Sequence, residues 1–203
     1  MSCSATSLST DETRPVDRAR IYVPLALVAA ALVGCAGPAS DLPALPSAPV
    51  GHYILGPGDT VRVITFDAEQ LTGEFRVGDG GDISVPLLGN VHAAGMSTRQ
   101  LGARLTAALV HTGMFKQPSV AVEVARYRPI FILGEVKKPG QYPFQPGMTV
   151  LTAVAIGGGF TYRAIKSAFS VVRIVSGRSI EGRAVRRTPL APGDVITVYE
   201  RHF

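Results

Sequence analysis

Short runs in which apolar and polar residues alternate recur along the chain from residue 61 onwards. The clearest run holds Val120, Val122 and Val124, which alternate with Ala121 and Glu123. A period of two places every second side chain on one face, so the run predicts a half-buried strand. Similar patterns predict single strands that begin at Val61 and that span 130–133 and 195–199. They also predict a hairpin, formed by 169–175 and 179–185 about residues 176–177. Two further short strands are predicted within 75–91, joined by a turn at 79–82.

Two stretches have the helical period instead. In the first, Ser97 can cap the helix and Gln100, three residues on, completes a capping box. An apolar stripe then follows at Leu101, Leu105, Ala108 and Leu109, and Gly113 is expected to end the helix. The second is a short helix over 150–156, which begins after Thr149 and is closed by the glycines at 157–159.

A Pro-Gly-Asp turn precedes two of the predicted strands. The first copy is Gly56, Pro57, Gly58 and Asp59, and the second is Pro192, Gly193 and Asp194. Proline presets φ, glycine accepts a positive φ, and an aspartate can bond backbone N–H groups two residues on, so both aspartates are interpreted as turn residues rather than catalytic ones. Structural turns are also expected at Gly134, Pro139 and Gly140.

These elements predict an α+β fold with two small sub-domains. The first spans 52–127 and the second 128–203. Arg128-Pro129 marks the boundary, because the residue before a proline avoids helical conformation.

The first 51 residues have a different character. Arg14, Arg18 and Arg20 precede an apolar run over 21–33, which is too short to span a bilayer and has the size of a signal-peptide core. The following Leu32-Val33-Gly34-Cys35 resembles the lipobox of bacterial lipoproteins. The resemblance implies that residues 1–34 are removed, that Cys35 is acylated and that the protein is held at the outer membrane. Residues 35–51 contain four prolines and are expected to form an extended tether.

Acidic residues among the first 20 positions are unusual for a leader, and they leave open whether translation starts further in. The alternative to a lipoprotein is a signal peptide that is cut elsewhere, with a chance cysteine at position 35.

Charge and composition exclude several kinds of function. The chain carries 20 Lys and Arg against 15 Asp and Glu, but the basic residues are scattered, which argues against nucleic acid as a partner. Its two cysteines, Cys3 and Cys35, exclude a disulfide framework in the folded part. The spacing of His, Cys, Asp and Gly residues matches no metal, phosphate-loop or nucleophile-elbow motif, so we expect no metal, no cofactor and no enzymatic activity.

Two basic clusters are the only ligand candidates among the charged residues. They could attract an acidic polysaccharide weakly, while a subunit interface or plain solvated surface is the alternative. Their members are Lys137 and Lys138 in the first cluster and Arg183, Arg186 and Arg187 in the second.

The order of these segments resembles the outer-membrane polysaccharide export family (Wza-like). Residues 53–59, 83–89 and 95–109 are similar to its α/β polysaccharide export domain, and residues 134–142 and 157–160 to its SLBB domain, a β-grasp-like module. The resemblance implies a homo-oligomeric ring that takes a capsular polysaccharide or exopolysaccharide from an inner-membrane copolymerase and carries it across the periplasm and outer membrane.

The chain differs from larger members of that family. It has room for one SLBB unit, and no amphipathic helix follows the last expected strand. We therefore expect an outer-membrane β-barrel partner, or another path for the polymer, to complete the crossing. Two other readings remain open: a monomeric periplasmic polysaccharide-binding module, and a polysaccharide hydrolase, which would need a pair of carboxylates in a cleft.

Overall fold

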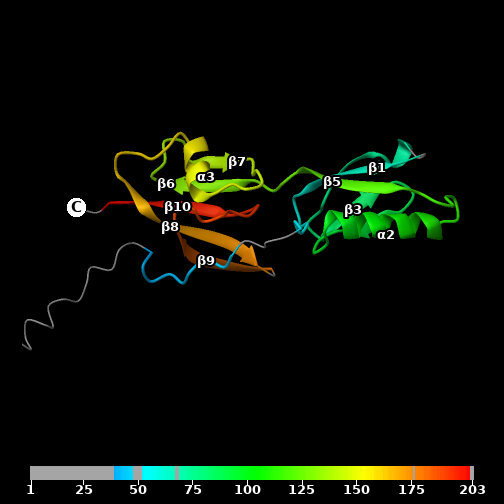
Figure 1. The fold of residues 1–203 in the computed structure, drawn as a ribbon, viewed down its shortest axis with the longest axis horizontal. Helices are drawn as coiled ribbons and strands as arrows, with labels where there is room; N and C mark the ends of the chain where they lie inside the picture. The colour runs from blue at the N-terminus through cyan, green and yellow to red at the C-terminus, as the bar shows by residue number, and fades with distance from the viewer. Residues whose placement is uncertain (1–38, 48–51, 67–68, 176, 202–203) are drawn as a thin grey trace, which may run out of the picture. The chain divides into compact units, whose positions relative to one another are not determined.

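The computed structural model describes residues 39–47, 52–66, 69–175 and 177–201 (Figure 1). The expected leader and Cys35 lie outside these residues. The described part has two hydrophobic cores, and we call the portions built around them the first lobe (52–127) and the second lobe (129–201). Short helices and several sheets make the fold α+β, as expected.

The first lobe is built on a three-stranded antiparallel sheet. Its strands are β1 (Thr60–Thr65), β2 (Gly73–Arg76) and β5 (Val120–Arg126), in the order β2-β1-β5. A short 3-10 helix, η3 (Glu69–Leu71), lies between β1 and β2 in the chain. On β1, Val61 and Val63 are buried while Arg62 is exposed, so one face of the sheet covers the core and the other meets solvent.

The strand pairing within 75–91 differs from the expectation. Strand β2 pairs with β1, and the hairpin is formed instead by β3 (Asp82–Val85) and β4 (Gly89–His92). Its turn contains two residues with positive φ, Leu87 at 66° and Gly89 at 70°. A left-handed leucine is uncommon and carries no sequence signal. The turn expected at 79–82 is present, since the Gly81 amide donates to the Gly78 carbonyl at 2.9 Å, but the strands on either side of it, β2 and β3, do not pair with each other.

Helix α2 (Thr98–His111) begins where the sequence predicts. Ser97 accepts a hydrogen bond from the Gln100 amide, and the Gln100 side chain accepts one from the Ser97 amide. Leu101, Leu105 and Leu109 are buried in the first core, and α2 packs against β5 (Figure 1). Gly113 lies just past the helix with a φ of 72°, which confirms the expected end.

The second lobe is a five-stranded mixed sheet with the order β7-β6-β10-β8-β9. Strands β6 and β10 are parallel and their other neighbours are antiparallel. The hairpin of β8 and β9 is confirmed, although β8 starts five residues earlier than expected, and β7 was not predicted. The strand bounds are β6 Ile130–Gly134, β7 Gly140–Tyr142, β8 Ala164–Val175, β9 Arg178–Ala184 and β10 Val195–Glu200.

Helix α3 (Val150–Ile156) covers the core of this lobe. A capping box between Thr149 and Thr152 starts it, and Gly157 caps its end. Val150, Ala153 and Val154 are buried in the second core. The short helix predicted over 150–156 is therefore confirmed.

Part of the segment that is expected to form an extended tether (35–51) pairs with the second lobe, within its described residues 39–47. The Arg183 amide donates to the Pro43 carbonyl at 2.7 Å, and the Leu45 amide donates to the Arg183 carbonyl at 3.2 Å. Leu45 packs against the second core, and the segment runs beside β9 (Figure 1). Proline lacks an N–H but keeps its carbonyl, so a proline-rich strand can still pair along a sheet edge.

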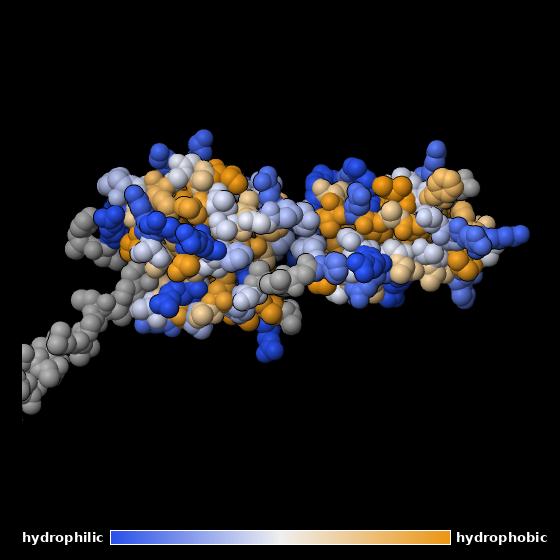
Figure 2. Space-filling model, viewed as in Figure 1, coloured by the Kyte–Doolittle hydropathy of each residue, from blue (hydrophilic) through white to orange (hydrophobic). Residues whose placement is uncertain are grey.

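Large apolar side chains remain on the surface of both lobes. On the face drawn in Figure 2, hydrophobic residues are interspersed with hydrophilic ones. The most exposed are Tyr162, at 87%, and Phe66, at 75%. Among the residues that the structure describes, no helix combines the length and hydrophobicity needed to cross a membrane.

Candidate functional site

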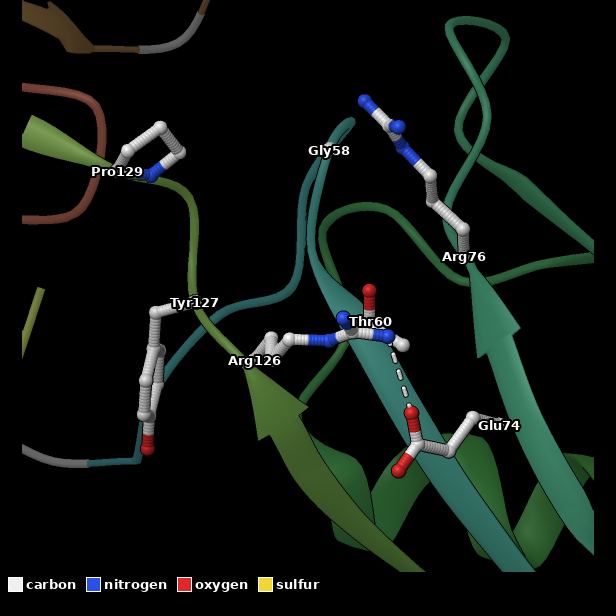
Figure 3. Close-up of a pocket in the computed structure, with 7 residues that line it drawn as sticks. All are labelled: Gly58, Thr60, Glu74, Arg76, Arg126, Tyr127 and Pro129. Carbon is white, nitrogen blue, oxygen red and sulfur yellow. Dashed lines mark hydrogen bonds and ion pairs between the residues drawn. The ribbon is translucent and has the colours of Figure 1, made fainter. Parts of the chain in front are cut away.

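A pocket of about 370 Å³ lies at one end of the sheet of the first lobe (Figure 3). Its lining combines basic, acidic and backbone groups from β1, β2, the end of β5 and the segment after it. The lining residues are Gly58, Thr60, Glu74, Arg76, Arg126, Tyr127 and Pro129. This volume is at the lower end of the range of small-ligand sites, about 300–1,000 Å³.

Strand register brings the two arginines of the pocket to either side of Thr60. Thr60 pairs with Arg76 on β2 and with Arg126 on β5. The register between β1 and β5 shifts directly after Thr60: β5 moves by two positions, from Arg126 to Val124, where β1 advances by one. Such a bulge redirects a side chain at the end of a strand. Neither arginine was singled out from the sequence, because the pairing of β1 with both strands could not be read there.

The carboxylate of Glu74 lies one row further along the same face. It accepts a hydrogen bond from Arg62 at 2.9 Å and another from Arg126 at 3.1 Å. The hydrogen bond from Arg62, and then the charge of Arg126, lower the pKa of Glu74 below its ordinary value. Glu74 is therefore ionised at neutral pH. Among the described residues, Arg76 has no carboxylate partner within ion-pair distance.

Behind the pocket, Asp59 of the first Pro-Gly-Asp turn is completely buried. Its Oδ2 accepts hydrogen bonds from the Tyr53 hydroxyl at 2.7 Å and the Gly56 amide at 2.9 Å. Its Oδ1 accepts one from the Arg128 amide at 3.0 Å and lies 3.3 Å from Arg128 Nε. A buried carboxylate with this many donors satisfies the requirement that a buried charge be paired and hydrogen-bonded.

The polar cluster also sets the ionisation of its other members. Burial, and then the hydrogen bond to Asp59, raise the pKa of Tyr53 well above its ordinary value. Burial alone would lower the pKa of Arg128, but the hydrogen bond to Tyr53 and the charge of Asp59 raise it instead. Tyr53 is therefore neutral and Arg128 charged at neutral pH.

The glycines of this turn leave room for the Arg128 side chain. A Cβ at Gly56 would lie 2.8 Å from Arg128 Nη1, and one at Gly58 would lie 3.2 Å from Arg128 Cγ. Gly58 also has a φ of 93°, which residues with a side chain rarely adopt. The turn thus fixes Gly58 at the wall of the pocket and holds Arg128 beside it.

The second Pro-Gly-Asp turn has a similar arrangement in the other lobe. Asp194 is 1% exposed and receives hydrogen bonds from Arg173 Nε at 3.0 Å, Arg173 Nη2 at 2.6 Å and the Ala191 amide at 2.8 Å. The same guanidinium donates to the carbonyls of Pro46 at 2.7 Å and Pro189 at 3.0 Å. It therefore also holds the segment that runs beside β9.

Both aspartates differ from the expectation in one respect. Each accepts from the amide three residues before it rather than from one two residues on. The sequence also carried no signal for their arginine partners, since Arg128 is 69 positions from Asp59 and Arg173 is 21 positions from Asp194. Both turns contact the connection between the lobes, because the Gly193 amide donates to the Pro129 carbonyl at 3.1 Å.

The other expected turn residues lie in the second lobe. Gly134 has a φ of 83°, and a Cβ there would overlap the carbonyl oxygen of Val198 on the neighbouring strand. Pro139 is exposed and precedes β7, which Gly140 begins. Gly140 pairs with Ile132 on β6.

The two basic clusters lie at different ends of α3. The amides of Lys137 and Lys138 donate to the carbonyls of Gly159 and Gly157, after the helix. The Arg186 carbonyl accepts from the Leu151 amide, at its start. The five basic side chains are exposed and do not form one site; they are Lys137, Lys138, Arg183, Arg186 and Arg187.

Within the described ranges, no group of three or more His, Cys, Asp or Glu side chains could hold a metal ion. His92 lies 2.8 Å from the Asp82 carboxylate, on the exposed hairpin of β3 and β4.

Two family models match the chain in succession. Residues 47–125 match the family described as polysaccharide biosynthesis/export protein, and residues 129–184 match the SLBB domain. The chain has one export domain followed by one SLBB domain, which is the succession of an OPX-type polysaccharide export protein. The matched family and the relatives are export and transport proteins rather than enzymes.

Curated relatives have similar descriptions. The exopolysaccharide production protein ExoF of Rhizobium meliloti is 38% identical over 119 residues, which cover 53% of this chain and 28% of the relative. The EPS I polysaccharide export outer membrane protein EpsA of Ralstonia solanacearum is 29% identical, and the alignment covers 53% of this chain and 35% of the relative. The polysialic acid transport protein KpsD of Escherichia coli is 29% identical, and the alignment covers 53% of this chain and 19% of the relative. The alignments thus span about a third or less of each relative.

Proposed function

We propose that the protein is a lipid-anchored subunit of a complex that exports a capsular polysaccharide or exopolysaccharide. The observation that carries this proposal is the succession of an export domain and an SLBB domain in one chain. The relatives add support, since they are named for exopolysaccharide production, polysaccharide export at the outer membrane and polysialic acid transport.

The chemistry of the pocket favours transport over hydrolysis. A glycoside hydrolase needs a general acid with a raised pKa beside a second carboxylate. The pocket contributes the single carboxylate of Glu74, whose pKa is lowered by Arg62 and Arg126. An ionised carboxylate held between two guanidinium groups is unsuited to donate a proton to a leaving group.

The proposed assembly has four further parts. Acyl chains on Cys35 hold the protein at the outer membrane, facing the periplasm. Several copies form a ring, an inner-membrane copolymerase delivers the polymer, and an outer-membrane partner completes its path. Because residues 43–46 run beside β9 in the second lobe, seven residues separate the anchored cysteine from a position fixed to that lobe.

Deletion of the gene tests the export role. The expected result is loss of polymer from the medium with newly made polymer retained inside the outer membrane, and restoration by the wild-type gene. Release of a polymer of altered length would support a hydrolase, and unchanged export would refute the proposal.

The Cys35→Ser variant tests the anchor separately. It should leave the protein unlabelled by radioactive palmitate and release it from the membrane fraction. Light scattering of the detergent-purified wild-type protein distinguishes the ring from the alternative of a monomeric binding module.

A further inference from the structure

The exposed face of the first sheet carries its charges in two adjacent rows. One row consists of Arg76, Thr60 and Arg126, as the strand register requires. In the next row, Arg62 lies between Glu74 on β2 and Glu123 on β5. The second row contains more negative than positive groups, while the first has no negative group, so positive charge is concentrated where the pocket lies.

Within the pocket itself, the charges do not balance. Arg126 is paired with Glu74 at 3.1 Å, and Arg62 holds the other oxygen of the same carboxylate. Arg76 is the pocket's surplus positive charge, since the described residues include no ion-pair partner for it. Figure 3 shows its side chain extending toward the turn at Gly58. A single uncompensated guanidinium favours an occupant with one anionic group.

The walls opposite the arginines are held in place before any ligand arrives. Gly58 and Pro129 are the sequence neighbours of Asp59 and Arg128, and the hydrogen bond and ion pair between these two residues fix both chain segments. The Gly193 amide holds the carbonyl of Pro129 from the other side. A preformed wall lowers the entropic cost of binding, which matters for a ligand that makes few contacts.

The chemistry of the lining selects a class of ligand. A guanidinium group matches a carboxylate in a planar, two-point geometry, and the Thr60 hydroxyl can both donate to and accept from sugar hydroxyls. The pocket is open and its arginines are solvated, so binding will be weak and will fall with added salt. Weak, repeated binding suits a polymer that must move on.

We propose that this pocket binds a carboxylate-bearing sugar residue of the exported polymer, with Arg76 as the principal ligand of the carboxylate and Arg126 as the second. The inference rests on the proposed export function and adds the class of sugar to it. It places the contact on the export domain rather than on the two basic clusters beside α3.

Titration of the isotope-labelled full chain, purified in detergent, with galacturonic acid oligomers tests the site by nuclear magnetic resonance. Maltose oligomers of equal length are the neutral comparison. We expect shift changes at Thr60, Glu74, Arg126 and Tyr127 with the acidic oligomer only. The Arg76→Gln variant should bind about ten-fold more weakly or worse, because it loses a charge-assisted hydrogen bond.

The matched control is Arg104→Gln. Arg104 is an exposed arginine on α2, which covers the opposite, core-facing side of the same sheet, so this variant should bind as the wild type does. Arg126→Gln provides a second variant of the pocket. Well-dispersed spectra of each variant without ligand show that it is folded.

Several results would overturn the inference. Equal binding of the neutral oligomer, unchanged affinity in both pocket variants, or shifts confined to Lys137 and Lys138 would each do so. Shifts of the pocket residues that grow with protein concentration, without saccharide, would assign the pocket to an acidic side chain of a second copy. If the titration shows no binding but gene deletion abolishes export, only the proposal of a carboxylate-bearing sugar is rejected. If export continues after gene deletion, the proposed export function itself is rejected.

Discussion

Replacing Arg173 by methionine should destabilise the second lobe strongly and the first lobe hardly at all. Arg173 is 3% exposed and forms two hydrogen bonds to the carboxylate of Asp194, which is itself 1% exposed. In the variant, the Ala191 amide remains as a donor to Asp194 Oδ2, while Oδ1 keeps no donor among the described residues. The variant therefore leaves a buried charge without its partner.

The expected size of the effect follows from that geometry. Removing one member of a buried ion pair costs about 3–5 kcal/mol of unfolding free energy. The lost hydrogen bonds to the carbonyls of Pro46 and Pro189 add to this cost. Because domains are stable by only about 5–15 kcal/mol, the second lobe should be close to unfolding.

Native-state hydrogen exchange measures the loss of stability separately for each lobe. Amide protection should fall in β8 and β10 of Arg173→Met and stay unchanged in β1 and β5, which belong to the other core. Arg178→Met, at an exposed position of β9, is the control and should change little. The double variant Arg173→Met/Asp194→Leu should recover much of the loss, because it buries no unpaired charge. A loss below about 1 kcal/mol, or an equal loss in both lobes, would refute the reasoning.

Three further predictions follow from single positions. Gly134→Ala should lower the free energy of unfolding, measured by chemical denaturation, by more than about 3 kcal/mol. The reason is that its Cβ would overlap the Val198 carbonyl and that Gly134 has a positive φ. A smaller loss would contradict the register of β6 and β10. Gly182→Val should displace the segment beside β9, because even a Cβ at this position would lie 2.6 Å from Leu45 Cα. Hydrogen exchange of the Leu45 amide should therefore become faster, and an unchanged exchange rate would refute the contact. In an ultraviolet titration, Tyr53 should ionise at higher pH than an ordinary tyrosine, since its pKa is raised. Its contribution to stability is complete below the ordinary tyrosine pKa of about 10 and is lost as the pH rises through the pKa of Tyr53 in the folded protein. Tyr53→Phe should remove this high-pH ionisation from the titration curve.

The elements that the sequence predicted best are those defined by local chemistry. Helix α2 needs only Ser97, Gln100 and an apolar stripe within a few residues of each other, and α3 needs only Thr149 and the glycines after it. The alternation of Val120, Val122 and Val124 likewise marks β5 without knowledge of its partner.

What could not be predicted depends on contacts between distant parts of the chain. Arg76 and Arg126 meet in the pocket because β1 pairs with both β2 and β5, and strand order is not encoded in alternation. The partners of the proline-rich segment at 43–46 could not be read from the sequence, because Arg173 on β8 and Arg183 on β9 lie more than 120 positions away. The arginines that pair with the two aspartates, Arg128 and Arg173, could not be identified from the sequence for the same reason.

The most direct test of the proposed function is contact between the protein and its polymer during export. A photoreactive phenylalanine derivative can replace Tyr127, which lines the pocket and leaves both of its arginines in place, in cells that make the polymer. The same derivative at exposed Arg104 on α2 is the control. Illumination should attach polymer to the protein at position 127, only while synthesis is active, and not at position 104. Absence of polymer adducts at position 127, in cells that export normally with the variant protein, would contradict the account.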